Sequence, residues 1–351
     1  MNRQVLAAFL AFAAAISVSC QTKVSEKPIG TPLTVKTPLG LPPVPVPADN
    51  PVTLETVALG RKLFYEKKLS ADNSISCSQC HSPQLGFTDG RKHSTGVGGK
   101  TGTRNAPTVI NAAYSPAQFW DGRAASLELQ AAGPIANPVE MNQPHEVSVA
   151  KLESDPEYRK LFAAAFGPGP VTIGKVEKSI ASFERTVISG DSPFDRYQYG
   201  GDKTALSPAA IRGLAIFTDR KKGNCSTCHT IGEKYALFTD GKYHNIGVGV
   251  NGEGEITDPG RYAESKAEVD RGAFKTPSLR NVGLSAPYMH DGSLKTLKDV
   301  VDFYAGGGNS NPNLDKEIKE TKLTGQERED LIEFLESLSG DIPKDAGPPT
   351  E

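Results

Sequence analysis

Cysteine, methionine and tryptophan are scarce in this chain of 351 residues, which holds five cysteines, three methionines and one tryptophan. Five cysteines are too few for a disulfide-stapled scaffold of this length, and their odd number needs another explanation. Neither sign of charge is in excess, because 39 Lys and Arg stand against 41 Asp and Glu. The chain therefore has no basic footprint for binding nucleic acid. Its length predicts about two domains.

The first 20 residues have the pattern of an export signal. Arg3 precedes an apolar run from Val5 to Val18, and Ser19-Cys20 follows. The run is too short for a membrane-spanning helix of about 20 residues and suits the core of a secretory signal peptide. Ser19-Cys20 resembles a bacterial lipoprotein cleavage site, which would make Cys20 a lipid anchor. The alternative is a cleaved signal with an incidental cysteine. Either way, we expect export to the periplasm or cell surface.

Two proline-rich segments flank the predicted globular body. Residues 21–51 show neither a helical nor an alternating apolar period, which predicts an extended, semi-rigid linker that holds the body away from a membrane anchor. Residues 343–351 are expected to be a disordered tail. Between these segments we place an N-terminal domain at 52–200 and a C-terminal domain at 201–342.

The remaining four cysteines belong to two copies of one motif, Cys77-Ser-Gln-Cys80-His81 and Cys225-Ser-Thr-Cys228-His229. C-x-x-C-H is the attachment signature of c-type haem, since two thiols form thioethers to one haem and the adjacent histidine binds its iron. Redox-active dithiols and half zinc sites are the competing interpretations. Two copies that use four of the five cysteines favour two covalent haem c groups.

The two motifs lie in diverged copies of one unit. Phe87-Thr-Asp-Gly90 recurs as Phe238-Thr-Asp-Gly241, and Asp121-Gly122 recurs as Asp291-Gly292. Apolar stripes at helical spacing predict helices before each motif, between the halves and near the C-terminus. The stripes are Leu54, Val57, Ala58 and Leu63; Ile211, Leu214 and Ala215; Val176, Ile180, Phe183 and Val187; and Leu331, Phe334, Leu335 and Leu338.

Local signals mark where two of these helices begin and end. Ser207-Pro208 predicts a cap and first turn, Thr324 with Glu327 predicts a capping box, and Gly340 is a plausible stop. Strand patterns are few. We therefore predict a mainly α fold with two tandem cytochrome c-like helical domains, each around one covalently bound haem.

The repeat distinguishes the second axial position of the two haems. The register that aligns Asp121-Gly122 with Asp291-Gly292 places Pro134 opposite Tyr304. Because proline offers no donor atom, the first iron is expected to have an open face that binds peroxide. Tyr304 is expected to close the second iron, which would then store or relay an electron. A half-buried core tyrosine is the alternative interpretation of Tyr304.

Polar groups gather in the sequence around Pro134. Cleavage of a bound peroxide requires a proton to move from its inner to its outer oxygen, and Glu140 is the natural general acid–base. Gln130 is expected to orient the peroxide. Trp120, the only tryptophan, aligns with His290 and is expected to relay electrons between the haems. The alternatives are solvated surface residues and a packed core tryptophan.

Residues 105–142 and 274–300, together with the two motifs, resemble the bacterial di-haem cytochrome c peroxidase superfamily over roughly residues 51–342. Ordinary peroxidases of that superfamily carry methionine at the position of Tyr304. The MauG-like branch, which oxidises residues of a partner protein, carries tyrosine there. In many relatives a distal histidine stands where this chain has Val97, so we expect a high-spin first haem that needs no activation.

The resemblance implies a role for each matching residue. His81 would be the proximal ligand of the peroxide-reactive haem, His229 and Tyr304 would ligate the second haem, and Trp120 would lie between them. Gln130, Pro134 and Glu140 would line the distal pocket. A calcium ion between the domains would be held by Asn105 and by backbone oxygens of Ser285 and Pro287, although the family usually has threonine at 285.

Three functions compete. The first is a periplasmic MauG-like enzyme that reacts with hydrogen peroxide at the N-terminal haem, shares the oxidising equivalents with the C-terminal haem, and oxidises Trp or Tyr of a partner protein. The alternative is a conventional cytochrome c peroxidase supplied with electrons by a small cytochrome. A non-enzymatic di-haem electron carrier is disfavoured, because a carrier needs both irons closed, whereas Pro134 leaves one open. Tyr304 favours the MauG-like enzyme.

Overall fold

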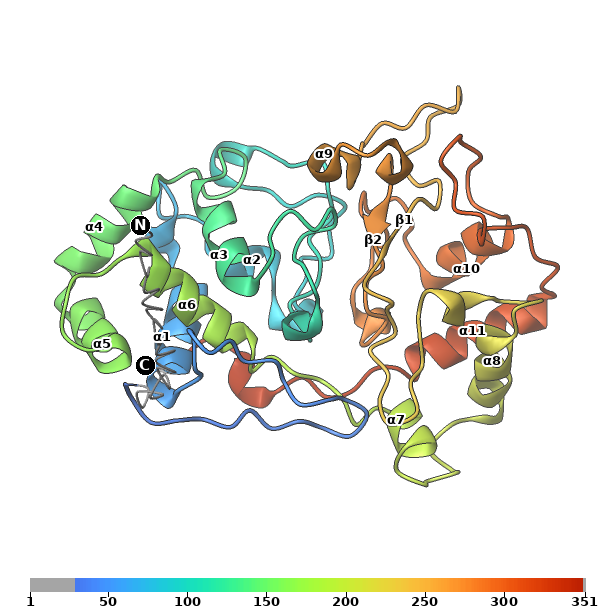
Figure 1. Ribbon diagram of the computed structural model, residues 1–351, viewed down its shortest axis with the longest axis horizontal. Coiled ribbons are helices and arrows are strands. Elements are labelled where there is room, and N and C mark those ends of the chain that lie inside the picture. Colours follow the sequence, from blue (N-terminus) through green and yellow to red (C-terminus); the bar gives the residue numbers. More distant parts are fainter. Residues whose placement is uncertain (1–28, 350–351) are drawn as a thin grey trace, which may run out of the picture.

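The computed structural model describes residues 29–349, which form two helical lobes lying side by side (Figure 1). The export signal and Cys20 lie outside the described residues. Among residues 29–349, no helix combines the length and apolar character needed to cross a bilayer. The helices are α1 (Leu54–Phe64), α2 (Cys77–Cys80), α3 (Leu127–Ala136), α4 (His145–Ser154), α5 (Pro156–Phe166), α6 (Ile173–Glu184), α7 (Pro193–Gln198), α8 (Pro208–Thr218), α9 (Tyr262–Ser265), α10 (Leu297–Ala305) and α11 (Gly325–Glu336). The mainly α prediction is confirmed.

The first lobe contains α1 to α6, and α1 packs on α6 at its centre. Thr53 caps α1 by accepting a hydrogen bond from the Thr56 amide, and Thr172 caps α6 in the same way. The core between these helices is apolar and includes the buried side chains of Leu59, Leu63, Phe64, Ile180 and Phe183. Three members of the predicted stripe, Val176, Ile180 and Phe183, are buried on α6, and the fourth, Val187, is buried just after the helix ends.

The second lobe contains α8, α10 and α11, with the short strands β1 (Tyr243–His244) and β2 (Phe274–Lys275) at its inner side. The strands pair antiparallel, with Tyr243 opposite Lys275. The core is a cluster of aromatic rings, Phe194, Phe217, Phe238 and Phe334, with centroids 5.0–6.4 Å apart. The predicted Ser207 cap of α8 and the Thr324–Glu327 capping box of α11 are both present.

The predicted tandem repeat is visible in backbone conformation. Asn111 and Asn281 are both left-handed, with φ of 61° and 58°, and each precedes a 3-10 turn. Phe119 and Met289 are also left-handed, with φ of 65° and 74°. Matching isolated bridges follow, Gln118 with Ala124 and Tyr288 with Leu294. Such conformations are rare outside glycine, so their recurrence shows that the halves share one template.

Two of the predicted helix faces are wrong. Of the predicted stripe on α1, Leu63 is buried but Leu54 is exposed, and the helix also buries Leu59 and Phe64. On α8 the predicted Ile211 is exposed, and the helix buries Ile216 and Phe217 instead. The apolar stripe on each helix is broad, and spacing alone did not identify which edge meets the neighbouring helix.

The predicted stop of the last helix is also displaced. α11 ends at Glu336 with Ser337 as its cap. Gly340 instead packs against the backbone of Gly190, where a Cβ would overlap the Gly190 carbonyl. Gly340 therefore allows close packing against the backbone of Gly190 and does not cap α11.

The proline-rich segment does not hold the body at a distance. Residues 29–51, hereafter the strap, run along both lobes (Figure 1). Tyr114 of the first lobe donates to the carbonyl of Pro42, and Arg280 of the second donates to that of Gly40 at 2.6 Å. Composition predicted the extended backbone, but it carried no information about these contacts.

The predicted disordered tail is wrong for residues 343–349. Ala346 is buried, and its carbonyl accepts a hydrogen bond from the Tyr65 hydroxyl at 2.8 Å. Arg61 holds the next carbonyl, that of Gly347, at 2.6 Å. The end of the described chain is therefore part of the first lobe.

A glycine sits at the main helix crossing of each lobe. A Cβ on Gly60 of α1 would overlap the Ser179 carbonyl of α6, and a Cβ on Gly213 of α8 would overlap the Asp330 carbonyl of α11. These two close approaches position the helices that precede the haem motifs.

We therefore predict that Gly213→Ala lowers the free energy of unfolding by about 1–3 kcal/mol, because the crossing has no room for a methyl group. Gly325→Ala on α11 is the matched control, since a Cβ there meets nothing within 4 Å. Urea unfolding followed by circular dichroism measures both. Equal stability of the two variants would show that α8 and α11 can move apart at this crossing without loss of stability.

Candidate functional site

The first motif forms a single helical turn, α2, directly after a polar cap. The Ser76 amide donates to Gln79 Oε1 at 2.9 Å, which starts the turn and places Cys77 and Cys80 on it. Nδ1 of His81 lies 3.2 Å from the Phe87 carbonyl oxygen. That contact assigns the proton to Nδ1 and leaves the Nε2 lone pair available to a metal. Burial lowers the pKa of His81, which keeps the ring neutral.

The second motif repeats this arrangement with a tighter turn. Cys225–Thr227 form a 3-10 turn, and Nδ1 of His229 lies 2.8 Å from the Phe238 carbonyl oxygen. Phe87 and Phe238, the two residues that supply the carbonyls, are both left-handed, with φ of 56° and 52°. Both histidines are thus held by the same strained backbone feature, which is typical of functional sites.

The donor sets fit covalent haem. The four motif cysteines form no disulfide. Burial raises the pKa of Cys77, of Cys80 and of Cys225, the last to about 12, so these three thiols are not poised as redox-active thiolates. The two motifs lie in different lobes, which does not support a zinc site shared between them. A thiol pair beside a histidine with a free Nε2 is what a covalently attached haem requires.

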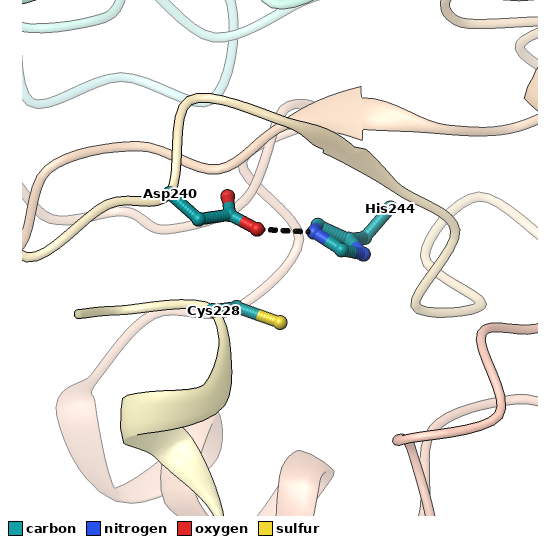
Figure 2. Close-up of side chains that lie close together, drawn as sticks. All are labelled: Cys228, Asp240 and His244. Atoms are coloured by element: carbon teal, nitrogen blue, oxygen red, sulfur yellow. Dashed lines mark hydrogen bonds and ion pairs between the residues drawn. The ribbon is translucent and has the colours of Figure 1, made fainter.

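Cys228 lies close to Asp240 and His244 within the described residues, and these three side chains have the chemistry of a metal site (Figure 2). However, His244 contacts carboxylates through both nitrogens, with Nδ1 2.6 Å from Asp315 and Nε2 3.0 Å from Asp240. Both nitrogens therefore donate, and neither has a lone pair for a metal. Hydrogen bonds with Cys228, Asp315 and Asp240 raise the pKa of His244 to about 10. The cluster is a clamp that joins the second motif to the segment after α10.

A cleft of about 450 Å³ lies against α3. Pro134 and Glu140, two of the residues predicted for the distal pocket, line this cleft. Gln130 lies one turn earlier on α3 but does not line the cleft, and Trp120 lies outside it. The complete lining is Phe119, Arg123, Ala124, Leu129, Gly133, Pro134, Ala136, Asn137, Pro138 and Glu140.

Glu140 is the titratable acid of this cleft. Burial raises its pKa, while a hydrogen bond from Asn137 and the charge of Arg123 oppose that rise. The Asn137 Nδ2 lies 2.6 Å from Glu140 Oε1, and Arg123 stacks on Phe119 with 3.5 Å between guanidinium carbon and ring centroid. No motif in the sequence assigned a role to Asn137 or Arg123. Their proximity to Glu140 and Trp120 in sequence was the available signal.

Tyr304 occupies the position in the second lobe that Pro134 occupies in the first. It stands near the end of α10, which starts with a capping box between Thr296 and Asp299. Burial, with the nearby Cys225 and Cys228, raises the pKa of Tyr304. The structure therefore brings the phenol close to the second motif.

Trp120 lies at the junction of the two lobes. Its indole Nε1 donates to the Asn105 carbonyl at 2.9 Å, and its own carbonyl accepts from the Lys275 amide at 2.8 Å. The Asn105 amide donates to the His290 carbonyl, in the loop that also carries Ser285 and Pro287. The Asn105 side chain donates through Nδ2 to the Arg91 carbonyl, so its Oδ1 lone pairs are not used by that bond.

Arg104 fastens the same junction. Its guanidinium reaches Asp121 beside Trp120 at 2.5 Å and holds Asp258 of the second lobe through two bonds of 2.8 Å. Arg261 adds bonds from the second lobe to the carbonyls of Asp121 and Gly122. The tryptophan is thus fixed by groups from both halves of the repeat.

Family comparisons agree with this geometry. A model for di-haem cytochrome c peroxidase matches residues 54–204, and a cytochrome c model matches residues 210–339. The methylamine utilization protein MauG of Methylorubrum extorquens is 42% identical over 299 residues, 85% of this chain and 82% of that protein. The cytochrome c551 peroxidase of Pseudomonas aeruginosa is 38% identical, covering 84% and 82% of the two chains.

The chain belongs to the di-haem cytochrome c peroxidase and MauG superfamily. A solved structure of a MauG-like protein associated with microbial copper homeostasis superimposes with a TM-score of 0.81 at 33% identity, covering 89% of this chain and 98% of that one. Membership confirms two tandem cytochrome c-like domains and an oxidoreductase. It implies two haem c groups at the C-x-x-C-H motifs and hydrogen peroxide as substrate.

We predict that Arg104→Gln lowers the free energy of unfolding by about 1–3 kcal/mol, because Asp121 and Asp258 lose a charged partner at the junction of this di-haem protein. Arg271→Gln is the matched control. Arg271 makes an equally short bidentate pair with Glu268, but on the surface, where little change is expected. Urea unfolding of the two holoproteins compares them. A larger loss in the control would contradict the proposed importance of the junction.

Proposed function

We propose that this protein is a MauG-like oxidase. It reacts with hydrogen peroxide in the first lobe, shares the two oxidising equivalents with the second lobe, and oxidises Trp or Tyr side chains of a partner protein. The observation that carries the proposal is the unequal pair Pro134 and Tyr304 at equivalent places in the repeat. Pro134 has no atom that would bind an iron in the first lobe, whereas Tyr304 would offer a phenol oxygen to the iron of the second lobe.

Each haem, when bound, supplies an iron that exchanges electrons, with His81 and His229 as proximal ligands. The free Nε2 of each histidine suits this role, and the backbone carbonyl on Nδ1 makes the imidazole a stronger ligand. Pro134 keeps the cleft beside the first motif free of a competing donor atom.

Glu140 moves the proton in this proposal. Its carboxylate accepts the proton from one oxygen of hydrogen peroxide and returns it to the other, which departs as water. Burial raises the pKa of Glu140, which makes its carboxylate a better proton acceptor for the first half of the transfer. Arg123 at the cleft wall supplies positive charge that favours the anionic form during turnover.

Tyr304 separates the proposed oxidase from a conventional peroxidase. A phenolate oxygen stabilises oxidised iron better than a methionine sulfur does. Similarity to MauG and to the MauG-like structure supports the oxidase. Similarity to cytochrome c peroxidases, at 38% identity for that of Pseudomonas aeruginosa, supports the alternative in which a small cytochrome supplies electrons.

Trp120 is proposed as the electron relay between the lobes, on the strength of its place at the junction. Because it is the only tryptophan, oxidising equivalents leave through a tyrosine or through close docking of the partner beside a haem.

Further assignments rest on the sequence resemblance. We place the enzyme in the periplasm, with Cys20 as the site of a lipid anchor. We also propose a calcium ion bound by the Asn105 side chain and the backbone oxygens of Ser285 and Pro287. Oxygen donors of this kind suit calcium.

Glu140→Gln is expected to slow the reaction of the holoprotein with hydrogen peroxide by about 10²–10⁴-fold, because the acid–base group is lost. In the unchanged protein the rate constant should rise with pH, since the carboxylate form accumulates above its raised pKa. Stopped-flow absorbance from pH 5 to 9 measures both. Glu177→Gln is a control, because burial also raises the pKa of Glu177 but it does not line the cleft. An unchanged rate in Glu140→Gln would refute the proton-transfer role.

Tyr304→Met is expected to alter the spectrum of the second haem and to shorten the lifetime of the peroxide-oxidised protein by at least about tenfold, a change of about 1.4 kcal/mol in barrier. Turnover with reduced cytochrome c should rise. Absorbance after peroxide addition and steady-state oxidation of cytochrome c test this. Tyr235→Met, at an exposed position of the same lobe, should change neither. An unaltered second-haem spectrum in Tyr304→Met would exclude ligation by Tyr304.

A further inference from the structure

We infer that Asn137 is a positioning residue for the reaction with peroxide: it binds one oxygen of Glu140 and leaves the other to carry the proton. The inference deepens the proposed function and rests on Glu140 as the acid–base group. Asn137 follows the last residue of α3 and lines the same cleft as Glu140.

The orientation of the Asn137 amide is fixed by the backbone. The Val139 amide lies 3.1 Å from Asn137 Oδ1, and because a backbone N–H only donates, that atom must be the oxygen. Nδ2 then points at Glu140 Oε1, 2.6 Å away. An amide flip would place a nitrogen against the Val139 donor and an oxygen against a carboxylate, so the assignment follows from chemistry.

The backbone of Glu140 is held as firmly as its side chain. Its amide donates to the Asn137 carbonyl at 3.0 Å, and its own carbonyl accepts from the Val97 amide at 2.8 Å. Gly96 packs so closely on this segment that a Cβ would overlap the Val139 carbonyl oxygen. With the main chain and Oε1 both fixed, the remaining oxygen, Oε2, is the atom free to exchange a proton.

Other charged groups around Glu140 do not reproduce this contact. Arg123 acts on Glu140 through charge and is held by Asp121, with Nη1 3.0 and 3.1 Å from its two oxygens. Lys100 on the neighbouring loop donates to the Pro138 carbonyl. Cys77 and Cys80 are close enough for Glu140 to affect their pKa values, but they lose their acidity as thioethers.

The Asn137 bond favours the carboxylate form of Glu140, so its loss should move the ionisation upward. A hydrogen bond to a charged group corresponds to about one to two pH units. Asn137→Asp keeps the acceptor for Val139 but replaces the donor by a second carboxylate. Asn137→Ser keeps a side-chain oxygen that can accept from the Val139 amide, but the serine side chain is too short to reach Glu140.

The experiment measures the pH profile of the rate constant for hydrogen peroxide with the di-haem holoprotein, by stopped flow. Both Asn137 variants should raise the midpoint by about one to two pH units. The midpoint is also measured without peroxide, from the protonated-carboxyl infrared band that disappears in Glu140→Gln.

Asn251→Asp is the matched control. Asn251 accepts from the Glu253 amide at 3.0 Å and donates to Glu255 at 3.0 Å, which is the same chemistry on an exposed loop of the second lobe. The pH midpoint of the Asn251→Asp variant should equal that of the unchanged protein. The inference would be overturned if both Asn137 variants kept the pH midpoint of the unchanged protein while Glu140→Gln lost that midpoint. The proposed function would then remain intact. A profile unaffected by Glu140→Gln would overturn both.

Discussion

The contact between a motif histidine and a phenylalanine carbonyl is the constraint on which each lobe depends. His81 and His229 can bind a haem iron through Nε2 only if the ring is held in one orientation and one tautomer. The carbonyls of Phe87 and Phe238 do this, and each requires a left-handed backbone that the surrounding core must support. Phe87 and Phe238 are themselves completely buried, so the core and the ligand geometry are determined by the same residues.

The two copies share a backbone template but differ at the positions that distinguish their sites. The distal helix of the first lobe carries Pro134 beside an acid whose carboxylate is held by Asn137, whereas the corresponding helix of the second carries Tyr304. The clamp around His244 also belongs to the second lobe alone. Its repeat mate His93 has a buried Nε2 without a hydrogen-bond partner within the described chain. In the proposed function, these differences suit the first lobe to proton transfer and the second to holding charge.

The sequence predicted the parts of the site that covalent chemistry fixes and not the parts that depend on packing. The C-x-x-C-H spacing, the repeat register and the paired positions of Pro134 and Tyr304 needed no knowledge of the fold. The contact of Asn137 with Glu140 depends on where α3 ends, and the burial of Ile216 rather than Ile211 depends on the approach of α11. Gln130, for which the family resemblance implies a distal role, does not line the cleft, because the sequence position of a helical residue does not determine which cavity its side chain faces.

The strap has a consequence for the electron exchange that is proposed between the lobes. Arg280 and Asp195 form a fully buried pair in the second lobe, and the carbonyl of Gly40 completes its hydrogen bonding, while Pro42 binds Tyr114 of the first lobe. The lobes are therefore joined on the side of the strap as well as at Trp120, and two separated attachments resist a hinge motion. In the proposed function, this arrangement would hold the two haems at a constant separation, so electron exchange between them would not depend on a domain motion.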